Sequence, residues 1–93
     1  MRHFVLVSYD IVSDRRRRKV MQTLEGFGLR VQYSVFECWL APRQIAVLEK
    51  RLRALIDTEE DSIRFYFLQR GDVRRIRVLG VGEVTPERAF YLR

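Results

Sequence analysis

A short apolar run that ends on an acid constrains this 93-residue chain more than any other feature. Residues 3–10 read His-Phe-Val-Leu-Val-Ser-Tyr-Asp. A run this short, and this rich in valine and aromatic side chains, predicts a strand buried on both faces rather than a helix. Such a strand holds Asp10 at its end on a rigid element. We therefore expect the rest of the chain to be arranged around this carboxylate.

A dense group of cations follows the acid. Residues 15–19 read Arg-Arg-Arg-Arg-Lys, and arginine makes permanently charged, bidentate contacts to phosphate. A carboxylate beside such a cluster is typical of phosphate chemistry, although a solvated helix face is the plain alternative. We predict nucleic-acid contacts for the cations that should fan outward, namely Arg15, Arg16, Arg18 and Lys19.

The same cations begin a predicted amphipathic helix. Ser13 or Asp14 should cap its start, and Gly28, after Gly26, should end it in a left-handed conformation. Arg17 falls one turn before the apolar stripe, and we expect it to point toward the strand end that carries Asp10. The stripe that should face the sheet consists of Val20, Met21, Leu24 and Phe27.

The remaining segments predict three further strands and one helix. Residues 29–40 form either one bent strand or a short hairpin, with the helices covering one face and a partner subunit the other. A helix begins at Pro42, and the acidic residues 57–61 are more typical of a solvated loop than of a metal site. Strands then follow at 63–67 and 74–79, and the second adds the cations Arg74, Arg75 and Arg77 to the basic, nucleic-acid-binding face.

This order of elements predicts an α+β fold, a ferredoxin-like sandwich with a mainly antiparallel sheet and two helices on one face. We expect a single domain over residues 1–93, with residues 81–93 as a tail that packs on a partner subunit. A chain of this size buries only roughly 60 to 65% of its unfolded surface, so a homodimer would stabilise it.

Composition limits the setting and the partners. Lysine and arginine number 18 against 12 acidic residues, a formal charge of +6 that favours polyanionic partners, although such a surface also serves solubility alone. Cys38 is the single cysteine, which excludes an intrachain disulfide and indicates a reducing compartment. No signal peptide or membrane-length apolar run is evident, so we expect a cytoplasmic protein without membrane association.

Asp10 is the candidate metal ligand. Mg²⁺ usually takes one or two carboxylates together with waters and substrate phosphates, so a single Asp10 would hold it poorly. Two subunits that face each other could share one ion between their Asp10 residues, with Arg17 clamping a phosphate oxygen. In the alternative reading Asp10 pairs with nearby arginines. Tyr9 and Phe36 would stack on bases or belong to the core, and His3 is a weak candidate for a base or ligand.

Several motifs together resemble the small CRISPR-associated adaptation proteins, the partners of the CRISPR integrase. They are Tyr9-Asp10-Ile11, Asp14 with the basic run to Lys19, and the stretch 28–37, which reads Gly-Leu-Arg-Val-Gln-Tyr-Ser-Val-Phe-Glu. The resemblance implies a ferredoxin-like homodimer that acts as an endonuclease on single-stranded RNA or double-stranded DNA. It implies Mg²⁺, or Mn²⁺ in its place, as the cofactor.

The same resemblance implies roles for individual residues. Lys19 stands where some members carry arginine. It keeps the positive charge but lacks the planar guanidinium that makes bidentate contacts. The resemblance also implies a second, non-catalytic role, in which the dimer bridges integrase subunits and binds a spacer-precursor duplex. The positions that match residues implicated in cleavage are Tyr9, Asp10, Arg17, Arg30 and Phe36.

Overall fold

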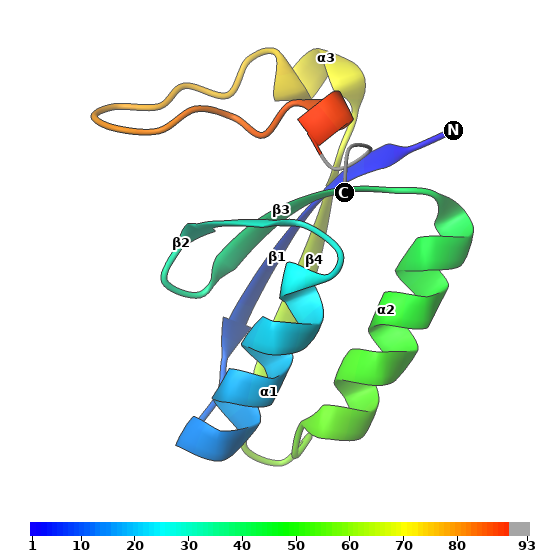
Figure 1. The fold of residues 1–93 in the computed structure, drawn as a ribbon, viewed down its shortest axis with the longest axis vertical. Helices are drawn as coiled ribbons and strands as arrows, with labels where there is room; N and C mark the ends of the chain where they lie inside the picture. Colours follow the sequence, from blue (N-terminus) through cyan, green and yellow to red (C-terminus); the bar gives the residue numbers. More distant parts are fainter. Residues whose placement is uncertain (90–93) are drawn as a thin grey trace.

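The computed structural model describes residues 1–89, and its four strands form one antiparallel sheet (Figure 1). The strand order is β2-β3-β1-β4, with β1 and β3 in the centre. This order and the succession of strands and helices confirm the predicted ferredoxin-like sandwich. The bounds of the strands are β1 His3–Asp10, β2 Leu29–Gln32, β3 Val35–Leu40 and β4 Ser62–Leu68.

Two helices cover one face of this sheet, as predicted (Figure 1). They are α1, Asp14–Glu25, and α2, Pro42–Leu55. Val20 and Leu24 of α1 are completely buried, and Leu48 and Leu52 of α2 are buried against them in the same core. Each such leucine contributes roughly 1.5 to 3 kcal/mol of transfer free energy. The sheet side of this core is formed by Val5, Val7, Tyr9, Phe36, Cys38 and Leu40.

The ends of α1 confirm one prediction and correct another. Ser13 is the N-cap, and its Oγ accepts the backbone N–H of Arg16 at 3.2 Å. Gly28 does not adopt a left-handed conformation; within residues 1–89 only Gly80 and Gly82 have positive φ. Gly28 is instead required by close packing, because a Cβ there would lie 2.4 Å from Cys38 Sγ and 2.6 Å from the backbone oxygen of Glu37.

Residues 29–40 form a hairpin rather than one bent strand. A turn at residues 33–34 joins β2 to β3, and the β-bulge between Arg30 and Gln32 shifts the register. On β3, Phe36 and Cys38 face the helices, whereas Glu37 and Trp39 point to the opposite, open face of the sheet.

The predicted strand at residues 74–79 is wrong. After β4 the chain forms a short helix, α3 (Arg70–Val73), then a turn and an irregular loop whose tip carries Leu79 at 97% exposure. The physical reason is the direction of the chain after α3, which leads over the open face instead of along the edge of β4. Residues 74–79 therefore pair with none of the strands in the described part.

The returning tail covers part of the open face. Thr85 is buried, where its N–H donates to Glu37 Oε1 at 2.9 Å and its carbonyl accepts Trp39 Nε1–H at 2.8 Å. A 3-10 turn, Glu87–Ala89, follows. This chain's own tail therefore covers a surface that we expected a partner to cover. Residues 90–93 of the predicted tail lie outside the described residues, and its packing on a partner stays a prediction.

None of the helices within residues 1–89 has the length and apolar character needed to span a bilayer.

Candidate functional site

The end of β1 places two neighbouring site residues on opposite faces of the sheet. Side chains alternate along a strand, so Tyr9 joins the core on the helix side while Asp10 is exposed on the open face. Asp10 lies opposite Ser62 of β4. Its carboxylate makes no hydrogen bond or ion pair with any residue in 1–89, so the alternative pairing with arginines does not occur there. The carboxylate is accessible to a ligand.

Arg17 reaches the same strand end from the helix side. Its Nη1 donates to the carbonyl oxygen of Ile11 at 2.8 Å, and its Nη2 forms an ion pair with Asp14. The structure thus brings Arg17 to the residue after Asp10, as the helical spacing predicts, but the guanidinium contacts backbone there and not the Asp10 carboxylate.

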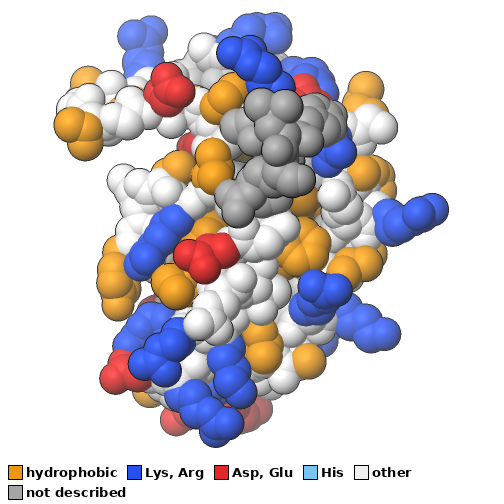
Figure 2. Space-filling view, viewed as in Figure 1, with side chains coloured by type: hydrophobic (Ala, Val, Ile, Leu, Met, Phe, Trp, Pro, Cys, Tyr) orange, Lys and Arg blue, Asp and Glu red, His pale blue; other side chains and the backbone are white. Residues whose placement is uncertain are grey.

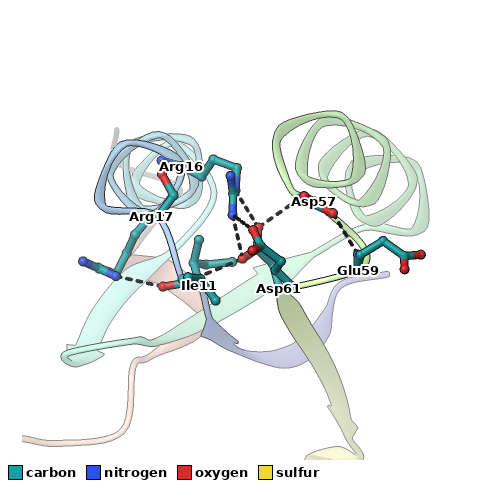
Figure 3. A network of polar contacts seen from close by, with 9 residues as sticks. Ile11, Arg16, Arg17, Asp57, Glu59 and Asp61 are labelled. Atoms are coloured by element: carbon teal, nitrogen blue, oxygen red, sulfur yellow. Dashed lines mark hydrogen bonds and ion pairs between the residues drawn. The ribbon is translucent and has the colours of Figure 1, made fainter.

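Arg16 does not fan outward, which corrects the prediction for this residue. Its Nε donates to Asp61 Oδ2 at 2.7 Å (Figure 3). Its Nη2 donates to Glu60 Oε2 at 2.9 Å. The Asp61 side chain has 0% exposure and also accepts the N–H groups of Val12, at 3.0 Å, and Asp57, at 2.9 Å. Arg16 therefore links α1 to the start of β4.

Electrostatics in this network follow from those contacts. The hydrogen bond from Arg16 is the largest cause that lowers the pKa of Asp61 to about 2, and the backbone donors act in the same direction. The same hydrogen bond raises the pKa of Arg16. Sequence reasoning assigned residues 57–61 to a solvated loop. No local signal distinguishes Asp61 from the acids around it, because its partner Arg16 lies 45 residues earlier in the sequence.

A pocket of about 310 Å³ lies beside the strand end, between α1 and the β2–β3 hairpin. Arg30 donates from Nε and Nη2 to the carbonyl oxygen of Tyr33, at 3.0 and 2.7 Å. The Arg30 guanidinium carbon lies 5.2 Å from the centroid of the Tyr33 ring. The lining residues are Tyr9, Asp14, Arg17, Arg18, Met21, Arg30 and Tyr33.

Tyr9 forms part of this pocket as a neutral phenol. Its hydroxyl donates to the carbonyl oxygen of Tyr33 at 3.4 Å, and burial is the largest cause that raises its pKa. Three of the residues matched by resemblance, Tyr9, Arg17 and Arg30, therefore gather in one pocket. Sequence reasoning missed Tyr33, although an aromatic side chain within the matched stretch was available as a signal.

Phe36 and His3 do not line that pocket. Phe36 is completely buried, and its ring lies tilted against Tyr9 with 6.4 Å between the centroids. His3 begins β1 and so lies at the opposite end of that strand from Asp10.

The predicted nucleic-acid contacts divide into two groups. Arg15, Arg18 and Lys19 are exposed near the start of α1. Lysine and arginine side chains gather in the lower part of the face that Figure 2 shows. The second group follows α3 at the other end of the sheet (Figure 1) and comprises Arg74, Arg75 and Arg77.

Arg64 is a further cation on the open face that sequence reasoning did not select. Register places Arg64 opposite Ser8 and Ser62 opposite Asp10, so Arg64 and Asp10 are diagonal neighbours on one face. A long side chain spans such a diagonal. The Arg64 Nη1 donates to the hydroxyl of Tyr66 at 3.2 Å, and this hydrogen bond raises the pKa of Arg64.

Residues 1–89 contain no cluster of three or more histidine, cysteine or acidic side chains that could hold a metal ion. Asp61 is satisfied by Arg16 and backbone donors, which leaves Asp10 as the accessible carboxylate of this strand end. One subunit therefore supplies one hard oxygen ligand group, which suits a magnesium ion only if waters, a phosphate or a second subunit complete the shell.

Comparison with known proteins gives consistent matches. The family model for CRISPR associated protein Cas2 matches residues 1–76. A protein of Chloroflexus aurantiacus named CRISPR-associated endoribonuclease Cas2 3 is 45% identical over 92 residues, which cover 99% of each chain.

Solved structures agree with these matches. The crystal structure of Streptococcus pyogenes Cas2 superposes with a TM-score of 0.74 at 40% identity, covering 83% of this chain and 99% of that one. A chain from a partial Cas6-RT-Cas1–Cas2 complex gives a TM-score of 0.74 at 35% identity, covering 85% and 91%.

Proposed function

Because the chain belongs to the Cas2 family of CRISPR-associated proteins, we propose that it is a metal-dependent endonuclease of CRISPR adaptation that hydrolyses phosphodiester bonds. One observation carries the proposal. The Asp10 carboxylate is exposed at the end of a central strand and has no partner within residues 1–89, in a region rich in arginine. A similar relative is named an endoribonuclease, which supports the same chemistry.

Asp10 would hold the metal together with the Asp10 of a second subunit. Two carboxylates with waters and substrate phosphate match the ligand set that Mg²⁺ or Mn²⁺ takes, and a twofold axis would supply the second acid. A metal bound there supplies a water of lowered pKa and neutralises charge on the scissile phosphate. The homodimer is part of this proposal.

The other residues act by binding and orienting the substrate. Arg17 and Arg30 present guanidinium groups to phosphate oxygens, which favours negative charge near the strand end. Tyr9 stays protonated, since burial raises its pKa, and so acts as a hydrogen-bond donor rather than as a base. Phe36 is buried and contributes by fixing the Tyr9 ring.

The test is cleavage of labelled single-stranded RNA and double-stranded DNA by purified protein over a titration of Mg²⁺ and Mn²⁺. Wild type should cut with metal, Asp10→Asn should not, and the control Asp72→Asn, which removes an exposed acid in α3, should match wild type. Equal cutting by wild type and Asp10→Asn would indicate a contaminating nuclease and contradict the proposal.

A scaffold role is the second candidate, favoured by the similarity to a chain from a Cas1–Cas2 complex. In this role the dimer bridges integrase subunits and its exposed cations bind a spacer-precursor duplex. The two functions require different atoms, because a scaffold does not need the Asp10 carboxylate. Spacer acquisition in cells carrying Asp10→Asn separates them: undiminished acquisition supports the scaffold, and lost acquisition with intact DNA binding supports the nuclease.

A further inference from the structure

The pocket beside Tyr9 combines an exposed aromatic ring with several cations. Tyr33 stands at the hairpin turn with 70% of its surface exposed, an unusual degree for an aromatic side chain. The Arg30 guanidinium carbon lies over the ring, 5.2 Å from its centroid. Core packing does not account for this tyrosine.

Charge in the pocket is positive. Arg17, Arg18 and Arg30 line it against one carboxylate, Asp14, so three positive charges and one negative charge leave two positive charges. Arg18 makes no hydrogen bond or ion pair with residues 1–89 and is exposed. Its guanidinium is therefore available to a phosphate, to which it can donate two parallel hydrogen bonds.

We propose that this pocket binds one unpaired nucleotide of a single-stranded nucleic acid, with the base stacked on Tyr33 and a neighbouring phosphate on Arg17 and Arg18. Aromatic stacking platforms beside cations are the usual means of binding single strands, and they tolerate any base. The volume of about 310 Å³ lies at the small end of the range for ligand pockets.

A duplex does not use such a pocket. Its bases are paired and stacked on one another, so a base must leave the helix before it can lie on a protein ring. The exposed cations of α1 can contact the backbone of either form. Tyr33 therefore distinguishes single strands from duplexes, whereas Arg15 and Lys19 do not.

The pocket lies next to the site at Asp10. Tyr9 lines the pocket, and Asp10 is the next residue, on the other side of the same strand end. A single strand that crosses this end of the sheet would place one base on Tyr33 and present a nearby phosphate to Asp10. This inference rests on the proposed function, to which it adds a base-binding subsite at Tyr33.

The test measures binding without cleavage. Fluorescence anisotropy in an Asp10→Asn background compares single-stranded RNA, single-stranded DNA of the same sequence, and the corresponding DNA duplex. Tyr33→Ala should weaken binding to a single strand by roughly 5- to 100-fold and change duplex binding by less than about twofold. Tyr33→Phe should bind like the parent, because it keeps the ring. Tyr66→Ala, which removes an exposed tyrosine on the open face, is the matched control.

An oligonucleotide with abasic positions completes the experiment. The parent should bind it more weakly than the intact strand, and Tyr33→Ala should bind both alike. An equal loss for duplex and single strands, or no loss for either single strand, would overturn the inference. Failure of wild type to cleave would contradict the nuclease alone, since ring-dependent binding of single strands is measured independently of cutting.

Discussion

Two aspartates lie close to one end of the sheet, one at the end of β1 and one just before β4, and their surroundings are opposite. Asp10 ends β1, and Asp61 directly precedes Ser62, the residue opposite Asp10 in the register. The Asp61 side chain is inaccessible and accepts four hydrogen bonds. Asp10 is exposed and accepts none within residues 1–89. The same side-chain type serves the fold at one position and is available to a ligand at the other.

The difference shows how a strongly basic helix can lie beside an accessible carboxylate. Arg16 pairs with Asp61, and Arg17 contacts Asp14 and the carbonyl of Ile11 rather than the Asp10 carboxylate. Asp61 also accepts the N–H of Val12, two residues after Asp10, and so fixes the segment that follows the strand (Figure 3). The buried Asp61 therefore stabilises the backbone next to the exposed Asp10.

The largest expected effect is the loss of cleavage activity when Asp10, rather than Asp61, is replaced. Asp10→Asn should lower metal-dependent cleavage by at least about a hundredfold, because an amide is a poorer ligand for a hard cation than a carboxylate. Its thermal midpoint should stay within about 2 °C of wild type, since an exposed side chain without partners contributes little to folding. Cleavage rates and thermal melts of the same preparation check both parts, and a large fall in the midpoint would contradict the comparison.

Asp61→Asn should produce the opposite pattern. The amide keeps the shape but removes the charge that pairs with Arg16, so we expect the thermal midpoint to fall by roughly 5 to 10 °C. Cleavage measured well below that midpoint should remain metal-dependent and of the wild-type order. A variant that melts like wild type but no longer cuts would show that Asp61, and not Asp10 alone, takes part in the chemistry.

Acid titration sharpens the same contrast. The pKa of Asp61 is lowered from its usual 3.8 to about 2 in the folded state, chiefly by Arg16. A carboxyl with a depressed pKa stabilises the fold fully above pH 4 and loses that contribution as pH falls through about 2. Urea midpoints of wild type and Asp61→Asn should therefore differ at pH 5 and approach each other near pH 2. A constant difference across this range would mean that the charge of Asp61 is not the cause.

Much of the fold could be predicted because buried apolar residues recur in the sequence at the spacing of the helix or strand that contains them. The apolar run before Asp10 predicts β1, and the stripe of Val20 and Leu24 predicts the inner face of α1. The stretch at 74–79 failed for a reason that period-2 alternation cannot reveal. Alternation predicts that a segment can pair, whereas pairing here depends on the direction in which α3 turns the chain.

The candidate site was harder to predict, because its polar contacts join residues far apart in sequence. The spacing of α1 indicates where Arg17 points, but nothing near Arg16 indicates a partner 45 residues away. Exposed charge and buried charge also look alike in a sequence: the acids at 57–61 resemble a solvated loop until β4 places Asp61 against α1. Tyr33 became recognisable once the hairpin turn was located, since exposure distinguishes it from core aromatics.

The smallest expected effect compares two arginines of the basic run. Arg18→Ala should reduce the slope of log binding constant against log salt by roughly 0.7 to 0.9 units, as one phosphate contact is removed, and should leave the thermal midpoint unchanged. Arg16→Ala should leave the slope nearly unchanged, because Asp61 and Glu60 already pair with that charge, but should lower the midpoint. Anisotropy titrations of an Asp10→Asn background at several salt concentrations measure the slopes. Equal losses of slope for both variants would mean that Arg16 leaves Asp61 and contacts phosphate when nucleic acid binds. Asp61 would then influence nucleic-acid binding as well as the stability of the fold.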